Sequence, residues 1–157
     1  MKQTSLCYIE NAGHYLMMHR TKKKNDENSG KWIGIGGKFQ HGETPEECML
    51  REVMEEAGIT PESYSYRGIV TFESDVYETE DMHLFTAKAS SRFHAECDEG
   101  ELAWIAKADI SSLNLWEGDR IFLELITDED APFFRLRLVY EGDALVSACL
   151  NDKEYLK

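Results

Sequence analysis

Three glutamates near the middle of the chain have a spacing that could hold a metal ion. Glu52, Glu55 and Glu56 lie at i, i+3 and i+4, so their carboxylates share one side of a helix. Like charges at this spacing destabilise a helix unless they are solvated, paired with cations or bound to a metal. Hard oxygen ligands suit Mg²⁺ or Mn²⁺, which bind phosphates while water completes their coordination. A solvated acidic helix face is the alternative interpretation.

The residues around these glutamates predict the helix that positions them. Thr44 precedes Pro45, and Glu47 follows Thr44 by three residues, which is a capping box with proline at the first helical position. Gly58 can end the helix because glycine adopts the left-handed conformation without a Cβ penalty. The apolar stripe of this helix is expected on the side opposite the glutamates and comprises Leu50, Val53, Met54 and Ala57.

The segment from Gly37 to Ile59 follows one longer pattern at every specified position. It reads G-x5-E-x7-R-E-U-x-E-E-x-G-U, where U is an aliphatic residue. In this pattern the chain resembles the Nudix hydrolase family, whose signature is this box. The resemblance implies an α/β/α sandwich with a mixed β-sheet between helices, formed here by a single domain over residues 1–157 with the box at 37–59.

The hydrophobic patterning independently predicts an α/β (α+β) fold. Alternating or continuous apolar runs predict strands at 4–9, 14–19, 31–39, 64–73, 82–89, 101–106, 133–140 and 144–150. The spacing of Ile121, Phe122, Leu125 and Ile126 predicts a second amphipathic helix at 116–126. Because both helices must bury an apolar stripe, a mixed sheet between helices is the expected arrangement.

Composition excludes several classes of partner. The chain of 157 residues has a net charge of −13, from 17 basic and 30 acidic residues, which argues against binding a nucleic-acid polymer or an anionic membrane. The four cysteines form no C-x-x-C pair, so neither a zinc site nor a disulfide framework is expected. Because the N-terminus has no sustained apolar run, a cytoplasmic location is expected. The expected oligomeric state is a monomer or a homodimer. One basic cluster, Arg20 with Lys22, Lys23 and Lys24, is either a solvated turn or faces phosphate.

The Nudix resemblance implies roles for the residues of the box. It implies that Glu52, Glu55, Glu56 and a backbone carbonyl at Gly37 bind Mg²⁺, with Mn²⁺ as a possible substitute. Either Glu52 or Glu56 would accept the proton of the attacking water, and we keep both as candidates. Arg51 is expected to pair with a carboxylate, either within the cluster or at Glu43.

Relatives often draw a further metal-binding carboxylate from a later loop. Asp98, Glu99 and Glu101 compete for this role, and we select Glu99. Lys38 is a candidate phosphate contact, although a surface lysine is an equal alternative.

Outside the box, the segments GKWIGIGGK and LWEGD and the hairpin residues Leu138, Val139 and Tyr140 resemble the MutT-like enzymes that hydrolyse oxidised purine nucleoside triphosphates. That resemblance implies that Trp116 stacks on the purine and that Asp119 bonds its edge, whereas a core anchor for the second helix is the alternative for Trp116. Ile33 is a departure, because animal enzymes of this branch have asparagine there and isoleucine cannot form a base-edge hydrogen bond.

The expected activity is Mg²⁺-dependent hydrolysis of a nucleoside triphosphate such as 8-oxo-dGTP to the monophosphate and pyrophosphate, a step in nucleotide-pool cleansing and DNA repair. One alternative is a pyrophosphatase for ADP-ribose or a dinucleoside polyphosphate. No proline occurs between Pro61 and Pro132, which disfavours the ADP-ribose branch, and Tyr77 is a weak hint of the dinucleoside branch. The other alternative is a nucleotide-sensing module without turnover.

Overall fold

The computed structural model describes residues 1–21 and 28–155, so Lys22, Lys23 and Lys24 of the predicted basic cluster lie outside the described residues. The strands are β1 (Lys2–Asn11), β2 (His14–His19), β3 (Trp32–Ile33), β4 (Ile35–Lys38), β5 (Ser63–Ser74), β6 (Glu80–Lys88), β7 (Glu101–Ala106), β8 (Phe134–Glu141), β9 (Ala144–Leu150) and β10 (Lys153–Glu154). The helices are α1 (Pro45–Ala57), the 3₁₀ helix η1 (Lys107–Ser112) and α2 (Glu117–Leu125). No helix in this described part is long and apolar enough to cross a membrane.

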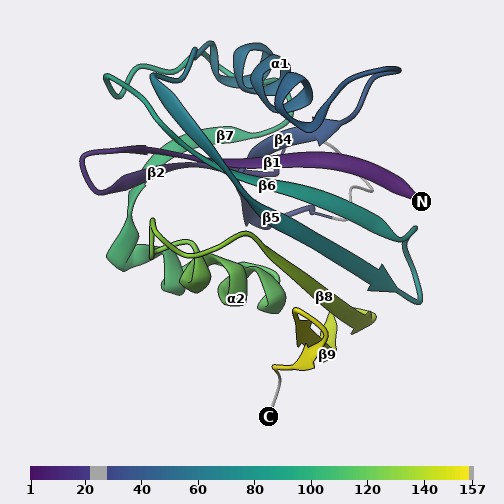
Figure 1. The fold of residues 1–157 in the computed structure, drawn as a ribbon. Helices are drawn as coiled ribbons and strands as arrows, with labels where there is room; N and C mark the ends of the chain where they lie inside the picture. The colour runs from purple at the N-terminus through teal and green to yellow at the C-terminus, as the bar shows by residue number, and fades with distance from the viewer. Residues whose placement is uncertain (22–27, 156–157) are drawn as a thin grey trace.

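The strands in the described residues join into one mixed sheet with β1 near its centre. β1 runs parallel to β6 along most of its length, while its start pairs antiparallel with β4 and its end with β2. β5 and β8 also pair in parallel, and β7 adds to the sheet through β2. α1 covers one face of the sheet and α2 covers the other (Figure 1). The predicted sandwich of a mixed sheet between helices is therefore confirmed.

Two hydrophobic cores, one on each face, explain why the central strands are almost continuously apolar. Tyr8 points to the α2 side, where it packs with Phe122, and its neighbour Ile9 points to the α1 side, where it joins Val53. Successive residues of a strand face opposite sides, so a sheet covered on both faces needs apolar residues at both alternations. This burial fixes the register of β1 and thereby places its first residues at the edge of the site.

Helix α1 begins and ends where the sequence predicts. Thr44 accepts a hydrogen bond from the Glu47 backbone, and the Glu47 side chain bonds back to Thr44, while Gly58 takes the left-handed conformation at φ 68°. The predicted apolar stripe is partly wrong, because Met54 is 48% exposed. The buried face instead centres on Met49, Val53 and Ala57 and includes Glu56. The packing of α1 against β1 and β4 rotates this face relative to the predicted stripe, so Glu56 points inward.

Two other predictions of local structure need correction. The predicted strand at 31–39 is two strands, since β3 pairs with β2 whereas β4 pairs with β1. They separate at Gly34, where a Cβ would lie 2.8 Å from the carbonyl oxygen of Cys7. Trp116 is the N-cap of α2 and not its first helical residue, and the short strand β10 was not predicted.

Candidate active site

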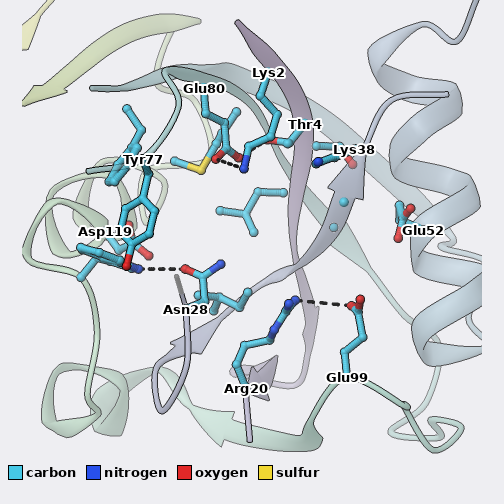
Figure 2. Close-up of a pocket in the computed structure, with 18 of the residues that line it drawn as sticks. Lys2, Thr4, Arg20, Asn28, Lys38, Glu52, Tyr77, Glu80, Glu99 and Asp119 are labelled. Atoms are coloured by element: carbon cyan, nitrogen blue, oxygen red, sulfur yellow. Dashed lines mark hydrogen bonds and ion pairs between the residues drawn. The ribbon is translucent and has the colours of Figure 1, made fainter. Parts of the chain in front are cut away.

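A cavity of about 590 Å³ contains most of the residues that the sequence singles out. Figure 2 shows Glu52 on α1 and Lys38 on one side of this space and Tyr77 and Asp119 on the other. We call the first side, with Glu52, Glu56 and Glu99, the carboxylate end. We call the second, with Phe72, Tyr77, Trp116 and Asp119, the aromatic end. The predicted site residues that line the cavity are Ile33, Gly37, Lys38, Glu52, Glu56, Glu99, Trp116 and Asp119.

Arg51 ties the loop before α1 to the acidic side of the helix. Its Nε and Nη2 donate to the two carboxylate oxygens of Glu43 at 2.6 and 2.9 Å. Its Nη1 donates to Glu52 at 2.7 Å and to Glu55 at 3.1 Å, and Nη2 also donates to the Lys38 carbonyl at 3.0 Å. The hydrogen bonds from Arg51 lower the pKa of Glu43 to about 2, and those carboxylates raise the pKa of Arg51. The predicted pairing of Arg51 with carboxylates is confirmed.

Gly37 lets the Glu52 carboxylate lie directly against strand β4. A Cβ built on Gly37 would lie 2.6 Å from the carboxyl carbon of Glu52 and under 3 Å from both its oxygens. The Gly37 carbonyl oxygen lies 3.5 Å from the buried Cys48 thiol on α1. The absence of a side chain at this position therefore brings a backbone segment and a helix carboxylate together at one wall of the cavity.

Glu56 is a buried carboxylate next to other carboxylates. It is 8% exposed, and its Oε2 has no hydrogen-bond partner among the described residues. Burial, followed by the proximity of Glu99 and then Glu52, raises the pKa of Glu56 far above its usual value. Glu99 also forms an ion pair with Arg20, in which Nη1 lies 3.4 Å from Oε2. Because ionised carboxylates only accept hydrogen bonds, the facing pair of Glu56 and Glu99 needs a proton or a cation between them.

Trp116 belongs both to the core and to the cavity wall. Its ring meets Phe72 and Tyr140 edge-on, with centroids 5.5 and 5.1 Å apart, and its Nε1 donates to Asn28 Oδ1 at 2.8 Å. The Lys31 ammonium lies 4.8 Å from the ring centroid. The core-anchor interpretation of this tryptophan is confirmed, and because the side chain also borders the cavity, stacking on a purine stays a prediction.

Asp119 is a buried carboxyl group at the start of α2. It is 6% exposed, and burial, followed by the negative charge of Glu80, raises its pKa to about 7. The preceding Gly118 allows this turn to pack closely, because its N–H donates to the Tyr140 hydroxyl at 2.7 Å and a Cβ there would collide with Leu138. The aromatic end thus combines a tryptophan with a carboxyl group that can change its protonation near neutral pH.

Comparison with known proteins identifies the family. The NUDIX domain profile matches residues 2–126. The chain belongs to the Nudix hydrolase family. An oxidized purine nucleoside triphosphate hydrolase of Danio rerio is 37% identical over 106 residues, covering 66% of this chain and 67% of that protein. The 8-oxo-dGTP diphosphatase of Escherichia coli is 47% identical over 49 residues, covering 31% of this chain and 34% of that protein. A MutT protein from Bacillus halodurans shares the fold, with a TM-score of 0.84 at 22% identity over 98% of this chain and 99% of that one.

Nudix hydrolases act on small nucleotide substrates and generally use divalent metal ions. The carboxylate end fits such an ion, because a buried Glu56 oxygen without a partner and two adjacent carboxylates form an oxygen-only set of donors. Within residues 1–21 and 28–155, no three His, Cys, Asp or Glu side chains are already gathered around one point. Arg51 draws Glu52 towards itself, and Arg20 does the same to Glu99. Metal binding would therefore compete with these two arginines for the carboxylates.

The structure separates the predicted metal ligands into two groups. Gly37, Glu52, Glu56 and Glu99 line the cavity. Glu55 does not line it, and its side chain is 55% exposed with Arg51 as its partner. The competing loop acids Asp98 and Glu101 are exposed and also lie outside the cavity lining.

Several cavity residues escaped sequence reasoning. Lys2, Thr4 and Glu80 line the cavity together, and Asn28 holds Trp116. The sequence signal for Lys2, Thr4 and Glu80 is that each is a polar residue near the start of a strand whose middle residues on the same face are apolar. Tyr77, for which a loop aromatic was the simpler interpretation, also lines the aromatic end and packs against the core.

Proposed function

We propose that this Nudix hydrolase cleaves an oxidised purine nucleoside triphosphate, such as 8-oxo-dGTP, to the monophosphate and pyrophosphate with Mg²⁺. The observation that carries the proposal is that one cavity joins a carboxylate end to an aromatic end that contains Trp116 and Asp119. A triphosphate at the first end and a purine at the second would fill such a space. The oxidized purine nucleoside triphosphate hydrolase of Danio rerio, at 37% identity, supports the same substrate class.

At the carboxylate end, Glu52, Glu56 and Glu99 would hold the metal. A bound Mg²⁺ neutralises phosphate charge and lowers the pKa of a water molecule for attack on phosphorus. Glu52 and Glu56 are the two candidates to accept the proton of that water, since both border the cavity from one helix. Arg20 and Lys38 also line this space and supply positive charge towards the phosphates of the substrate.

At the aromatic end, Trp116 would offer its indole to the purine and Asp119 its carboxyl group to the base edge. Trp116 is held by two edge-on aromatic contacts and by Asn28, so little side-chain freedom remains to be lost on binding. Asp119 is fixed on the first turn of α2. Ile33 adds an apolar contact at the same cavity and leaves the polar recognition of the base to carboxyl groups.

The test is turnover by the purified protein on a substrate panel with Mg²⁺. The panel contains 8-oxo-dGTP, dGTP, the other nucleoside triphosphates, ADP-ribose and a dinucleoside polyphosphate, with products separated by chromatography. We expect the highest kcat/KM for 8-oxo-dGTP, release of pyrophosphate and not orthophosphate, and loss of turnover when the metal is chelated. Trp116→Leu should raise KM for 8-oxo-dGTP and dGTP alike, because the stacking surface serves both bases.

Other outcomes would contradict the proposal in distinct ways. Preference for ADP-ribose or a dinucleoside polyphosphate would keep the chemistry at the carboxylate end and discard the substrate. Tight binding of one nucleotide without turnover of any would indicate a sensor module.

A further inference from the structure

Glu80 is a partly buried carboxylate in the cavity to which the proposed chemistry assigns no role. It is the first residue of β6, and its side chain is 12% exposed. In Figure 2 it borders the space between Lys38 on one side and Tyr77 and Asp119 on the other. A charged group in such a place destabilises the fold unless it is paired and hydrogen-bonded. Glu80 meets this condition through partners on β1, and its place in the cavity lining puts it where a bound ligand would meet it.

The sheet register brings Glu80 next to the aromatic end. Phe72 on β5, Glu80 on β6 and Lys2 on β1 form a row of direct partners across three strands. Phe72 also meets Trp116 edge-on with centroids 5.5 Å apart. Because neighbouring strands lie roughly 5 Å apart, Glu80 is about one strand away from the ring that supports Trp116. A purine stacked on Trp116 would have its edge within reach of this carboxylate.

Two side chains of β1 hold Glu80 in a defined orientation. The Thr4 hydroxyl donates to Glu80 Oε2 at 2.6 Å, and the Lys2 ammonium lies 3.4 Å from Oε1. Lys2 and Thr4 are two residues apart on one strand, so both face the same side of the sheet. The carboxylate is thus fixed as a hydrogen-bond acceptor before any ligand arrives, which lowers the entropy lost on binding.

Glu80 and Asp119 border one cavity, and both are mostly shielded from solvent. Both line the cavity, and the charge of Glu80 raises the pKa of Asp119, second only to burial. Two carboxyl groups of this kind favour a ligand edge that offers N–H donors and disfavour one that presents a lone pair, because an unpaired acceptor facing a carboxylate is strongly unfavourable.

We propose that Glu80 is a second base-reading carboxylate that, together with Asp119, selects purines whose edge offers adjacent N–H donors. This inference rests on the proposed function and specifies its substrate class. Guanine and 8-oxoguanine present N1–H beside the 2-amino group, which matches two acceptors. Adenine presents an unprotonated N1 beside its 6-amino group, so one acceptor would face a lone pair. Hypoxanthine keeps N1–H but lacks the 2-amino group, and it should be intermediate.

The test measures binding of nucleoside monophosphates by isothermal titration calorimetry, so that it does not depend on turnover. The ligands are 8-oxo-dGMP, dGMP, dIMP and dAMP, and the proteins are wild type, Glu80→Gln and Glu78→Gln. Glu80→Gln keeps the shape of the side chain and should weaken dGMP and 8-oxo-dGMP by roughly tenfold or more, with little change for dAMP. Glu78 controls for the loss of one negative charge, because it lines the same cavity but its side chain is 60% exposed and pairs with the N-terminal ammonium.

A third variant separates orientation from charge. Thr4→Val removes the hydroxyl that orients Glu80 and should reduce the dGMP preference, and Thr4→Ser should restore it. Unchanged ratios among the four ligands in a folded Glu80→Gln protein would overturn the inference, as would an equal effect of Glu78→Gln. If Glu80→Gln hydrolyses 8-oxo-dGTP with the base preference of wild type, the inference about Glu80 is wrong but the proposed function stands. Failure of the wild type to hydrolyse 8-oxo-dGTP would instead remove the proposed function.

Discussion

The guanidinium of Arg51 forms a two-point ion pair with Glu43, through Nε at 2.6 Å and Nη2 at 2.9 Å. The same group also contacts Glu52 at 2.7 Å. One side chain therefore fixes both the loop that leads into α1 and a carboxylate that lines the cavity. Because Arg51 is not among the residues that line the cavity, we infer that it acts by positioning Glu52 and not by contacting substrate.

Arg51→Lys should reduce activity much more than it reduces stability. Lysine keeps the charge but cannot make the planar two-point contact, so Glu52 loses its fixed position. We expect kcat to fall roughly ten- to a hundredfold with a smaller change in KM, because misplacement by about 1 Å has effects of this size. Steady-state kinetics together with thermal unfolding will check this. A kcat equal to that of wild type would show that Arg51 does not position Glu52.

Alanine at two adjacent glycines should have two different effects. At Gly36 a Cβ would lie 1.8 Å from the Ser5 carbonyl oxygen, so Gly36→Ala must displace β1 or β4 and should lower the free energy of unfolding by about 3 kcal/mol or more. At Gly37 the nearest atoms belong to the movable Glu52 carboxylate. Gly37→Ala should therefore leave urea unfolding nearly unchanged while turnover falls. Full activity in folded Gly37→Ala would contradict the role assigned to Glu52.

The sequence predicts those parts of the site that depend only on residues close together in the chain. The capping box at Thr44, the stop at Gly58 and the spacing of Glu52 and Glu56 all lie within one helix, and the structure has them as predicted. Which face of that helix is buried depends on the sheet beneath it, and there the prediction failed. Met54 was expected inside and is exposed, whereas Glu56 is buried.

The remainder of the cavity depends on pairing between distant segments. Lys2 and Glu80 are neighbours only because β1 and β6 pair in parallel, and no local pattern specifies that pairing or its register. Asn28 likewise reaches Trp116 across 88 positions of sequence. The sequence carries no signal that residues joined by such contacts lie close together, so the carboxylate end was predictable and most of the lining around Glu80 was not.

Glu56→Gln should abolish turnover without lowering the stability of the metal-free protein. In wild type a buried carboxylate faces Glu99 and Glu52, and one of its oxygens has no partner among the described residues. Glutamine cannot ionise, so the variant avoids the free-energy cost of keeping this group protonated at neutral pH or charged beside the other carboxylates, and the Tm measured in chelator should equal or exceed that of wild type. When the Mg²⁺ concentration is one hundred times its Kd, Mg²⁺ should stabilise wild type by roughly 2.7 kcal/mol. It should stabilise the variant much less.

The control for this experiment is Asp98→Asn, which removes one negative charge next to Glu99 from an exposed residue outside the cavity lining. It should keep both turnover and the Mg²⁺-dependent rise in Tm. Wild-type turnover in Glu56→Gln would remove this carboxylate from the mechanism.

Asp119 should make the stability of the protein depend on pH near neutrality. Its pKa is raised from 3.8 to about 7, first by burial and then by Glu80, with Lys31 and Arg120 acting in the opposite direction. Between these two values the folded state binds more protons than the unfolded state, so stability falls as pH rises towards 7. The contribution of this one group between about pH 5 and pH 8 is roughly 3 kcal/mol at 1.36 kcal/mol per unit.

Urea unfolding of wild type and Asp119→Asn at a series of pH values isolates this contribution. The difference between the two proteins cancels the other titrating groups, and the asparagine variant should lose relatively less stability as pH rises. Glu80→Gln should reduce this loss, because removing the Glu80 charge lowers the pKa of Asp119 and leaves a smaller excess of bound protons in the folded state.

 With a lower folded-state pKa, Asp119 releases its proton at lower pH, so the loss of stability with rising pH is complete earlier in the titration. The expected result for Glu80→Gln is thus a smaller loss that ends at lower pH than in wild type. Parallel pH profiles for wild type and Asp119→Asn would show that Asp119 does not titrate in this range.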